Sequence, residues 1–422
     1  MTQLRTSTPP SPERWKQFGP LRLAFTDQFN WMWSSEGSSA DDVSFWQPIP
    51  PEGFFILGGL IYPSFDDPNG KAWALCVQAD ESDRGALAFP SSFSWIWDSV
   101  GSHCDAEGSC WLPEPPNGYS RLGEIMTQNH DAPSGAGAYN IVCVRNDLVR
   151  EGATGNRIWT DAGTGASHDM SAWEVIPGPD AADTGKVLLA ANTFIGHSNY
   201  ERPTWNLGVL HLPIPVTRQP APAIPTLNSR IRPDPSTAPQ CERIVTVPFT
   251  AISDPARDLH RQVMDTPFYD VERWSSYTLL LFDDNGTSSP QHTEMSVASG
   301  ITEELSKTFS ITTGLEIGYE TGIDLVAKSK ASVKLTLQFG YSTTSSVSEF
   351  RSETVTAHLD TPAGKAGALW GATDTFRIKR RDGSYVSSEL QFEDSDSYVH
   401  AEFPHADDMP KGRKFVSFPA AK

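Results

Sequence analysis

The chain has 422 residues, of which 38% are hydrophobic and 20% charged, and its formal net charge at pH 7 is −19. This length supports two or three domains, and 32 Gly and 33 Pro are typical of a turn-rich globular protein. The acidic balance, without a local basic patch, excludes a nucleic-acid partner. No apolar run reaches the roughly 18 residues of a transmembrane helix. The N-terminus lacks the apolar stretch of a signal peptide, so we expect a soluble protein exported by another route.

The N-terminal half contains three repeats marked by tryptophan. Three tryptophans are each followed after 13 or 14 residues by a second one, and a serine stands two positions before each second tryptophan. The pairs are Trp33 and Trp46, Trp97 and Trp111, and Trp159 and Trp173. Short alternating runs and Gly/Pro turns accompany all three units. We therefore predict an all-β, pseudo-threefold, β-prism-like domain.

Two of these repeats share a longer motif. Trp46-Gln-Pro-Ile-Pro-Pro-Glu-Gly-Phe54 aligns with Trp111-Leu-Pro-Glu-Pro-Pro-Asn-Gly-Tyr119, and a Leu-Gly pair follows in both units. With Cys143-Val-Arg-Asn-Asp147, this pattern resembles the family named for vacuolar protein sorting-associated protein 62, over about residues 17–212. The resemblance implies a fold and a trafficking association but no reaction.

The tryptophans of this half have two possible roles. Their recurrence in register with structural turns favours core positions, whereas exposed tryptophans would stack on sugar rings. If the domain binds glycans, the candidate hydrogen-bonding carboxylates are Asp80, Asp98 and Asp147. We name no sugar.

Eight prolines between Leu212 and Gln240 predict a semi-rigid linker. The expected division is an N-terminal tail (1–16), the repeat domain (17–212), the linker (213–240), a second β domain (241–404) and a C-terminal tail (405–422). Helix signals are nearly absent, so the predicted fold class is all-β throughout.

The second domain contains a long stretch in which apolar and polar residues alternate. This period of two is typical of strands with one wet and one dry face, and each limb is as long as the roughly 9–11 residues of a membrane-spanning strand. The apolar face consists of Phe309, Ile311, Leu315, Ile317, Tyr319, Ile323, Leu325, Val333, Leu335, Leu337, Phe339 and Tyr341. The polar face consists of Ser310, Thr312, Glu316, Glu320, Asp324, Lys330, Lys334, Thr336 and Gln338. In a barrel the first set faces lipid and the second lines the lumen.

The charges on the polar face predict a hairpin centred on Ala327. This register places Asp324 opposite Lys330 and Glu320 opposite Lys334. The alternative is an ordinary half-buried antiparallel sheet, whose apolar face stays in the core. The length of the alternation and the flanking Ser/Thr-rich blocks favour the inserting hairpin.

This pattern resembles the aerolysin-type β-pore-forming toxins, including insecticidal bacterial proteins, over about residues 241–404. The resemblance implies a soluble monomer that binds a receptor or glycan at a target-cell membrane, forms a homo-oligomer and inserts a Ser/Thr-rich hairpin. It also implies activation by proteolysis, for which Lys411, Arg413 and Lys414 offer a trypsin-like site. A non-inserting lectin-like or trafficking adaptor protein is the alternative function.

Catalytic and metal motifs are not evident. The ten histidines form no His-Glu-x-x-His motif, and no Gly-x-Ser-x-Gly elbow occurs. The five cysteines have no zinc-site spacing, and Cys104 and Cys110 are more consistent with free thiols than with a small disulfide loop. We expect a non-enzyme without cofactor or metal.

Overall fold

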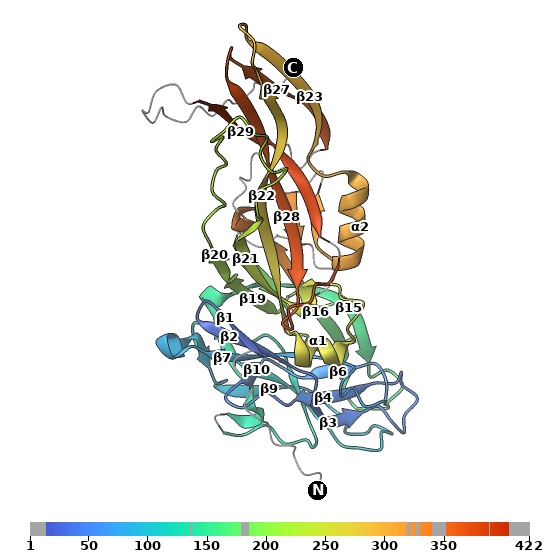
Figure 1. The fold of residues 1–422 in the computed structure, drawn as a ribbon. Coiled ribbons are helices and arrows are strands. Elements are labelled where there is room, and N and C mark those ends of the chain that lie inside the picture. The colour runs from blue at the N-terminus through green and yellow to red at the C-terminus, as the bar shows by residue number, and fades with distance from the viewer. Residues whose placement is uncertain are drawn as a thin grey trace. The chain divides into compact units, whose positions relative to one another are not determined.

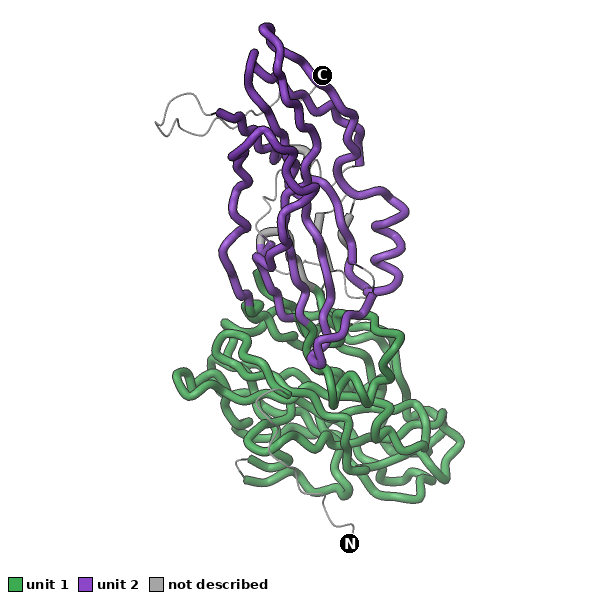
Figure 2. Tube along the Cα trace, in the orientation of Figure 1, with its two compact units in different colours: residues 1–215, 247–269, 326–334 green, residues 216–246, 270–325, 335–422 purple. Residues whose placement is uncertain are grey.

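The computed structural model describes residues 14–135, 137–178, 185–318, 322–325, 330–339, 352–387 and 389–404. The chain divides into two compact units (Figure 2). Unit 1 comprises residues 1–215, 247–269 and 326–334, and unit 2 comprises residues 216–246, 270–325 and 335–422. Both are built mainly from antiparallel strands, as the sequence predicts (Figure 1). The described residues also contain two α-helices that the sequence analysis did not predict.

The described residues of unit 1 form twenty short strands and the helix α1 (Leu259–Asp265). Its strands are β1 (Trp15–Phe18), β2 (Leu21–Thr26), β3 (Phe29–Ser34), β4 (Ser44–Pro48), β5 (Phe55–Ile56), β6 (Leu60–Tyr62), β7 (Ala74–Ala79), β8 (Leu87–Ala88), β9 (Ser92–Asp98), β10 (Ser109–Glu114), β11 (Tyr119–Ser120), β12 (Ile125–Thr127), β13 (Cys143–Arg145), β14 (Val149–Glu151), β15 (Ala153–Thr160), β16 (Ser171–Ile176), β17 (Lys186–Leu189), β18 (Phe194–His197), β19 (Gly208–Pro213) and β26 (Ala331–Lys334).

The three sequence repeats form three equivalent antiparallel sheets. Their strand orders are β3-β4-β6, β9-β10-β12 and β15-β16-β18. The central strand of each sheet starts at the repeated serine, which pairs with Tyr62, Thr127 or His197. The predicted pseudo-threefold arrangement is therefore present in the strand pairing.

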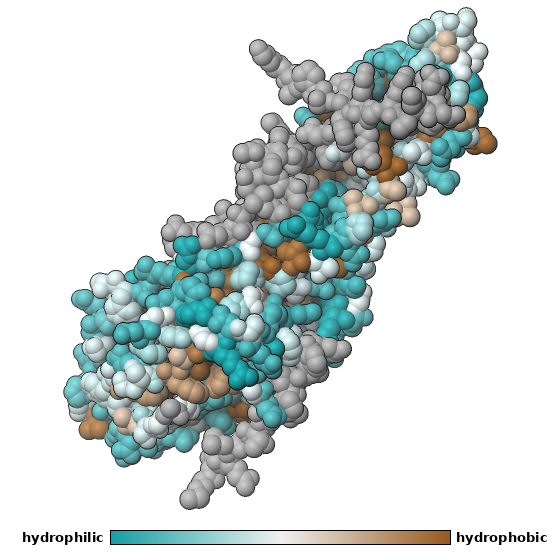
Figure 3. Space-filling view, turned by 90° about the vertical axis from the view of Figure 1, so that its left-hand side faces the viewer, coloured by the Kyte–Doolittle hydropathy of each residue, from teal (hydrophilic) through white to brown (hydrophobic). Residues whose placement is uncertain are grey.

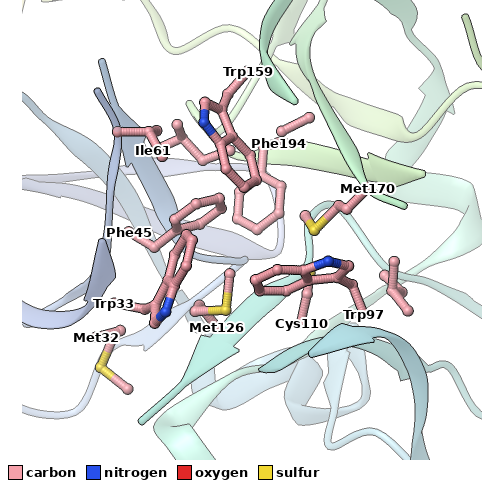
Figure 4. Close-up of a cluster of buried hydrophobic side chains, with 13 residues drawn as sticks. Met32, Trp33, Phe45, Ile61, Trp97, Cys110, Met126, Trp159, Met170 and Phe194 are labelled. Carbon is pink, nitrogen blue, oxygen red and sulfur yellow. The ribbon is translucent and has the colours of Figure 1, made fainter. Parts of the chain in front are cut away.

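The first tryptophan of each repeat forms the centre of unit 1 (Figure 4). Trp33, Trp97 and Trp159 are almost fully buried, and their rings meet edge to face with centroids 5.1 to 6.3 Å apart. Each indole Nε1 donates to a carbonyl oxygen of the next repeat: Trp33 to Ala106 (3.0 Å), Trp97 to His168 (2.9 Å) and Trp159 to Asp41 (3.1 Å). These bonds join the first repeat to the second, the second to the third, and the third back to the first.

The second tryptophan of each repeat bonds to the serine that precedes it by two residues. The Nε1 atoms of Trp46, Trp111 and Trp173 lie 2.8, 2.7 and 2.8 Å from the serine Oγ atoms. All three tryptophans are buried. The repeated Ser-x-Trp motif therefore satisfies an indole N–H inside the core, which would otherwise cost free energy.

The Leu-Gly motif has a steric reason at the point where the repeats meet. A Cβ on Gly58 would lie 2.8 Å from the Cα of Gly123, and a Cβ on Gly123 would lie 2.5 Å from the Cβ of Thr193. Two of the three equivalent positions must therefore be glycine, and the third repeat departs from the motif with Thr193.

Residues 247–269 belong to unit 1, although they follow the predicted linker. Phe249 packs on Phe25 and Trp73, with ring centroids 4.8 and 5.5 Å away, and Phe268 packs on Phe25 at 5.6 Å. These aromatic contacts add about twenty residues from beyond the linker to the repeat unit. The linker itself contains a strand, β20 (Val216–Arg218), which pairs with β21 (Gln240–Pro248).

Unit 2 is built on long strands. The order β20-β21-β22-β28-β29 forms one five-stranded sheet, and β23 pairs with β27 in a second sheet. Apolar side chains of β23 and β27 pack against Leu280, Leu281 and Leu369 of the larger sheet. The elements not yet given are β22 (Phe268–Asp284), β23 (Gln291–Ser299), α2 (Glu303–Thr313), β24 (Glu316–Gly318), β25 (Gly322–Leu325), the 3-10 helix η5 (Thr336–Phe339), β27 (Glu353–Thr361), β28 (Ala366–Lys379) and β29 (Leu390–Phe403).

Replacing Trp97 by Phe should destabilise the protein. The carbonyl of His168 and the carboxylate of Asp161, both bonded to the Trp97 Nε1 atom, would lose a donor, and a smaller ring leaves a void. We expect a loss of about 2–4 kcal/mol in the free energy of unfolding, measured by urea denaturation. Trp31→Phe is the control, because Trp31 is 37% exposed and should change stability by less than about 0.5 kcal/mol. Equal effects of the two substitutions would contradict the bonding role of Trp97.

Stability should also depend on pH through Glu124. Burial raises the pKa of this carboxyl to about 8, against a smaller opposing effect of the Gly196 N–H that donates to it. Because the folded state favours the protonated form, stability should fall as the pH rises from about 4.5 to about 8. Each unit of separation between the folded and unfolded pKa values is worth about 1.4 kcal/mol. Glu124→Gln should flatten the curve in this range, whereas Glu52→Gln, which changes an exposed carboxylate, should not. A curve for Glu124→Gln that falls as steeply as that of the native protein would contradict this assignment.

Candidate functional site

The predicted membrane-inserting segment lies between β23 and β27. These two strands pair in register over their whole length, from Gln291 opposite Thr361 to Ser299 opposite Glu353. The ends of the intervening segment, residues 300–352, are therefore held side by side. The described parts of this segment are α2, β24, β25, β26 and η5.

The first part of the segment is helical, which corrects the predicted strand over residues 309–313. Thr302 caps α2 by accepting the N–H of Leu305 through its Oγ1 atom at 3.2 Å. Gly314 ends the helix with a positive φ of 72°, and its N–H donates to the Ser310 carbonyl. An N-cap threonine followed by two acidic residues and a closing glycine are helix signals that the alternation obscured.

Most of α2 is exposed. Among its apolar residues, Phe309 is buried, whereas Leu305 is 49% and Ile311 is 76% exposed. A helix with so little buried apolar surface is weakly held, because packing of an apolar face supplies most helical stability in proteins. The helix therefore gains little stability from packing.

The predicted hairpin around Ala327 is described only in part, because Ala327 and Glu320 lie outside the described residues. Within its first limb, Glu316 pairs with Asp324 and Gly318 pairs with Gly322, a pairing that the prediction did not contain. The second predicted limb divides into β26, which pairs with β17 in unit 1, and η5. The sequence predicted one continuous limb over residues 309–325, whereas in this structure the first residues of that limb belong to α2 and the later described ones pair as β24 and β25.

One end of the segment is fixed to the long strands of unit 2. The guanidinium of Arg273 donates to the Phe339 carbonyl at 2.6 Å and forms a bidentate pair with Asp374 at 3.1 and 3.0 Å. The ring of Phe339 is fully buried and meets Phe376 edge to face at 5.1 Å. Such charge-assisted bonds are among the stronger ones in proteins, so η5 is held more firmly than α2.

The predicted apolar face is largely covered where its side chains are described. Phe309, Leu315, Leu335 and Phe339 are buried, and Ile311 is exposed. The backbone alone is described for Ile317, Ile323, Leu325, Val333 and Leu337, while Tyr319 and Tyr341 lie outside the described residues.

Some side chains of the predicted polar face are more exposed to solvent than the buried ones of the apolar face. Ser310, Thr312 and Gln338 are half-buried. Lys330 donates from Nζ to the Val175 carbonyl at 3.1 Å, and burial lowers the pKa of its ammonium group. The backbone alone is described for Glu316, Asp324, Lys334 and Thr336, and Glu320 lies outside the described residues, as do Lys411, Arg413 and Lys414 of the predicted cleavage site.

Two of the three candidate glycan carboxylates are engaged within the chain. Asp80 pairs with Arg22 at 3.0 Å, and Asp147 pairs with Arg145 at 2.6 Å. Hydrogen bonds from Ser82 lower the pKa of Asp80, and the bond from Arg145 lowers the pKa of Asp147. These carboxylates hold neighbouring turns, and the structure gives them no evident role with a ligand.

Asp98 lies beside an exposed tryptophan that the sequence analysis did not select. Trp95 is 41% exposed, its Nε1 donates to Asp98 Oδ2 at 3.1 Å, and its ring meets His168 edge to face at 4.9 Å. An exposed indole beside polar groups is suited to stacking on a sugar ring. Strict alternation would place Trp95 on the same buried face as Trp97, two residues away, so the sequence pattern does not indicate its exposure. The strand β9 has an extra residue between these two tryptophans, opposite Cys110 and Trp111, and this bulge breaks the alternation.

Other large apolar residues are exposed on the described surface, among them Ile231 at 77% and Ile311 at 76%. On the side drawn in Figure 3, hydrophobic residues form small separate patches in a mainly hydrophilic surface. Among the described residues, no helix has the length and hydrophobicity needed to cross a bilayer. All five cysteines carry free thiols, including Cys104 and Cys110.

Comparison with known proteins gives a family match for the N-terminal half. The family described as vacuolar protein sorting-associated protein 62 matches residues 13–211. This half is similar to that family, as its repeats predict. A comparison with curated proteins gave no match.

Two solved structures are similar to this chain, one over 43% and the other over 76% of its length. GNIP1Aa from Chromobacterium piscinae is 26% identical over 43% of this chain, with a TM-score of 0.34. The matched region spans 34% of GNIP1Aa, about a third of its length. Cry35Ab1 is 14% identical, with 76% of this chain and 89% of the other covered and a TM-score of 0.35.

Proposed function

We propose that this chain is a pore-forming protein of the aerolysin type, in which unit 1 recognises a cell surface and the segment between β23 and β27 inserts into the membrane. The insecticidal target belongs to the same proposal and rests on the resemblance stated from the sequence pattern. Homo-oligomers would then close several hairpins into a barrel, because an isolated hairpin leaves unpaired backbone groups in lipid.

The observation that carries the proposal is the register of β23 and β27. Residues 291 and 361, like residues 299 and 353, average to position 326, so a ladder continued from this pair turns at 326. The alternation of the sequence independently predicts a turn at 327. The two turn positions differ by one residue, so the partners across the ladder differ by two. Both registers place odd-numbered residues opposite odd-numbered residues.

The two faces of the β23–β27 pair also match the two faces of the predicted hairpin in polarity. On β23 and β27 the odd-numbered Val297, Ala357 and Leu359 are buried, while the even-numbered Glu294 and Ser296 are exposed. In the predicted hairpin the odd positions are likewise apolar and the even positions polar. The existing sheet and the alternating stretches 309–325 and 331–341 therefore share the same partition of faces, so that joining them needs no exchange of the two faces.

A specific observation favours the alternative, a binding protein that does not insert. Leu335 and Phe339 are fully buried, as expected of permanent core residues. In that case unit 2 serves as a scaffold, and the surface around Trp95 and Asp98 carries the binding function.

The substitution Ile311→Arg tests insertion without disturbing the soluble protein. Ile311 is 76% exposed and Ile231, which lies outside the segment, is 77% exposed, so Ile231→Arg is a closely matched control. Both variants should unfold within about 0.5 kcal/mol of the native protein. In a barrel Ile311 would face lipid, where an arginine costs up to about 2–4 kcal/mol per chain, depending on depth.

The measurement is dye release from vesicles prepared from candidate target membranes. We expect release by the native protein and by Ile231→Arg, and at least a tenfold slower release by Ile311→Arg. Binding of the native protein without release would overturn the pore and favour the adaptor alternative. Equal release by the two arginine variants would contradict the lipid-facing position of Ile311.

A further inference from the structure

Four polar side chains form a square on the exposed face of the β23–β27 sheet. His292 stands opposite Asp360, and Glu294 stands opposite His358. Each histidine is followed two residues later by a carboxylate, so that all four point to the same face of the antiparallel pair. The sequence analysis expected no metal site, because the two His-x-acid pairs are far apart in the chain and converge only through the ladder.

We propose that His292, Glu294 and His358 bind a divalent transition-metal ion of the zinc type. Their ligand atoms lie within 4.8 Å of one another. Glu294 Oε1 is 2.8 Å from His292 Nε2 and 3.2 Å from His358 Nδ1. A tetrahedral zinc ion with bonds of about 2.0–2.1 Å separates its ligands by about 3.4 Å, so small side-chain adjustments suffice to admit the ion.

The fourth residue supports this assignment independently. His292 Nδ1 is bonded to Asp360 Oδ1 at 2.6 Å, which leaves Nε2 of the same ring turned toward the shared centre. A metal-binding histidine commonly donates its other ring N–H to a carboxylate, which orients the ring and increases its basicity. Asp360 is placed to perform this positioning role.

The donor set selects the class of ion. Two imidazole nitrogens and one carboxylate oxygen suit zinc, and also copper, nickel or cobalt, in preference to calcium or magnesium, which favour all-oxygen sites. The two rings stack at 5.5 Å with an angle of 26°, so both can contribute a nitrogen from the same side of the sheet. The side chains are about half exposed, which leaves room for water as a fourth ligand.

The ion would join the two strands that bracket the segment 300–352. His292 and Glu294 belong to β23, whereas His358 belongs to β27, so one ion crosslinks both strands in their present register. Metal binding itself does not depend on pore formation. Its consequence, a fixed base for the continued ladder, rests on the proposed function.

The direct test is calorimetric titration of the untagged full-length protein with zinc chloride. We expect one saturable site in the native protein, and at least a tenfold weaker affinity in His292→Gln and in His358→Gln. His400→Gln is the matched control, because His400 is an exposed histidine of a neighbouring strand outside the cluster, and its affinity should be unchanged. Absence of saturable binding, or equal binding by the cluster variants and the native protein, would overturn the site.

A second measurement distinguishes a bridging ion from binding to a single strand. Zinc should slow amide hydrogen exchange in both β23 and β27 of the native protein, and should have no such effect in His358→Gln. Protection of β23 alone would contradict the crosslink. Because neither measurement uses membranes, a failure of dye release leaves the test of the metal site intact.

Discussion

The hydrogen-bonded ladder between β23 and β27 is the constraint on which the functional account depends. It holds the ends of a long segment side by side and fixes which residues face each way. The described parts of this segment include the helix α2, the antiparallel pair β24–β25 and the strand β26, which pairs with β17. A long hairpin would pair the residues of the segment in one continuous ladder. Such a hairpin would keep the pairing of β23 with β27 unchanged. It would differ from the present structure only in how the residues between these two strands pair with one another.

Unit 1 shows how repetition in sequence becomes a closed structure. The three central indoles bond cyclically to the next repeat, so that no repeat completes its core alone. This arrangement places the repeated tryptophans in the core. In the proposed function, recognition would then depend on residues that do not repeat in all three units. Trp95 is such a residue, since the equivalent position of the third repeat is Arg157, as judged by their partners Trp111 and Trp173. A rigid, cyclically bonded core is a suitable support for a binding surface built from its outward-facing strand residues.

Much of unit 1 could be predicted from the sequence because its signals are local and repeated. The Ser-x-Trp spacing of Ser44 and Trp46 corresponds to a hydrogen bond between their side chains. The glycine at position 58 corresponds to a close contact with the next repeat. The position of residues 247–269 could not be predicted, because contacts of Phe249 with Phe25 and Trp73 depend on tertiary packing. The proposed metal site could not be predicted from the sequence either. His292 and His358 are far apart in the chain and come close only because β23 pairs with β27.

The segment 300–352 was predicted only in part, for a different physical reason. The alternation of apolar and polar residues favours strands that pair in a hairpin. Thr302 and Gly314, in contrast, favour a helix over part of the same residues, and the structure contains that helix. Under the proposed function this segment forms two structures, and its sequence carries signals for both. Choosing between them requires the surroundings of each, which are the protein core in this structure and lipid in the proposed pore.

The most direct test of the account is a reversible lock between β26 and β17. Leu188 and Ser332 are directly paired, and antiparallel partners lie at a distance that a disulfide can span, so both can be replaced by cysteine. Dye release should be blocked in the oxidised protein and restored by a reducing agent, with membrane binding unchanged throughout. A Thr217→Cys and Ile244→Cys pair, which locks β20 to β21, should have no effect. If the oxidised Leu188–Ser332 lock releases dye as fast as its reduced form, the segment does not leave unit 1 to form the pore.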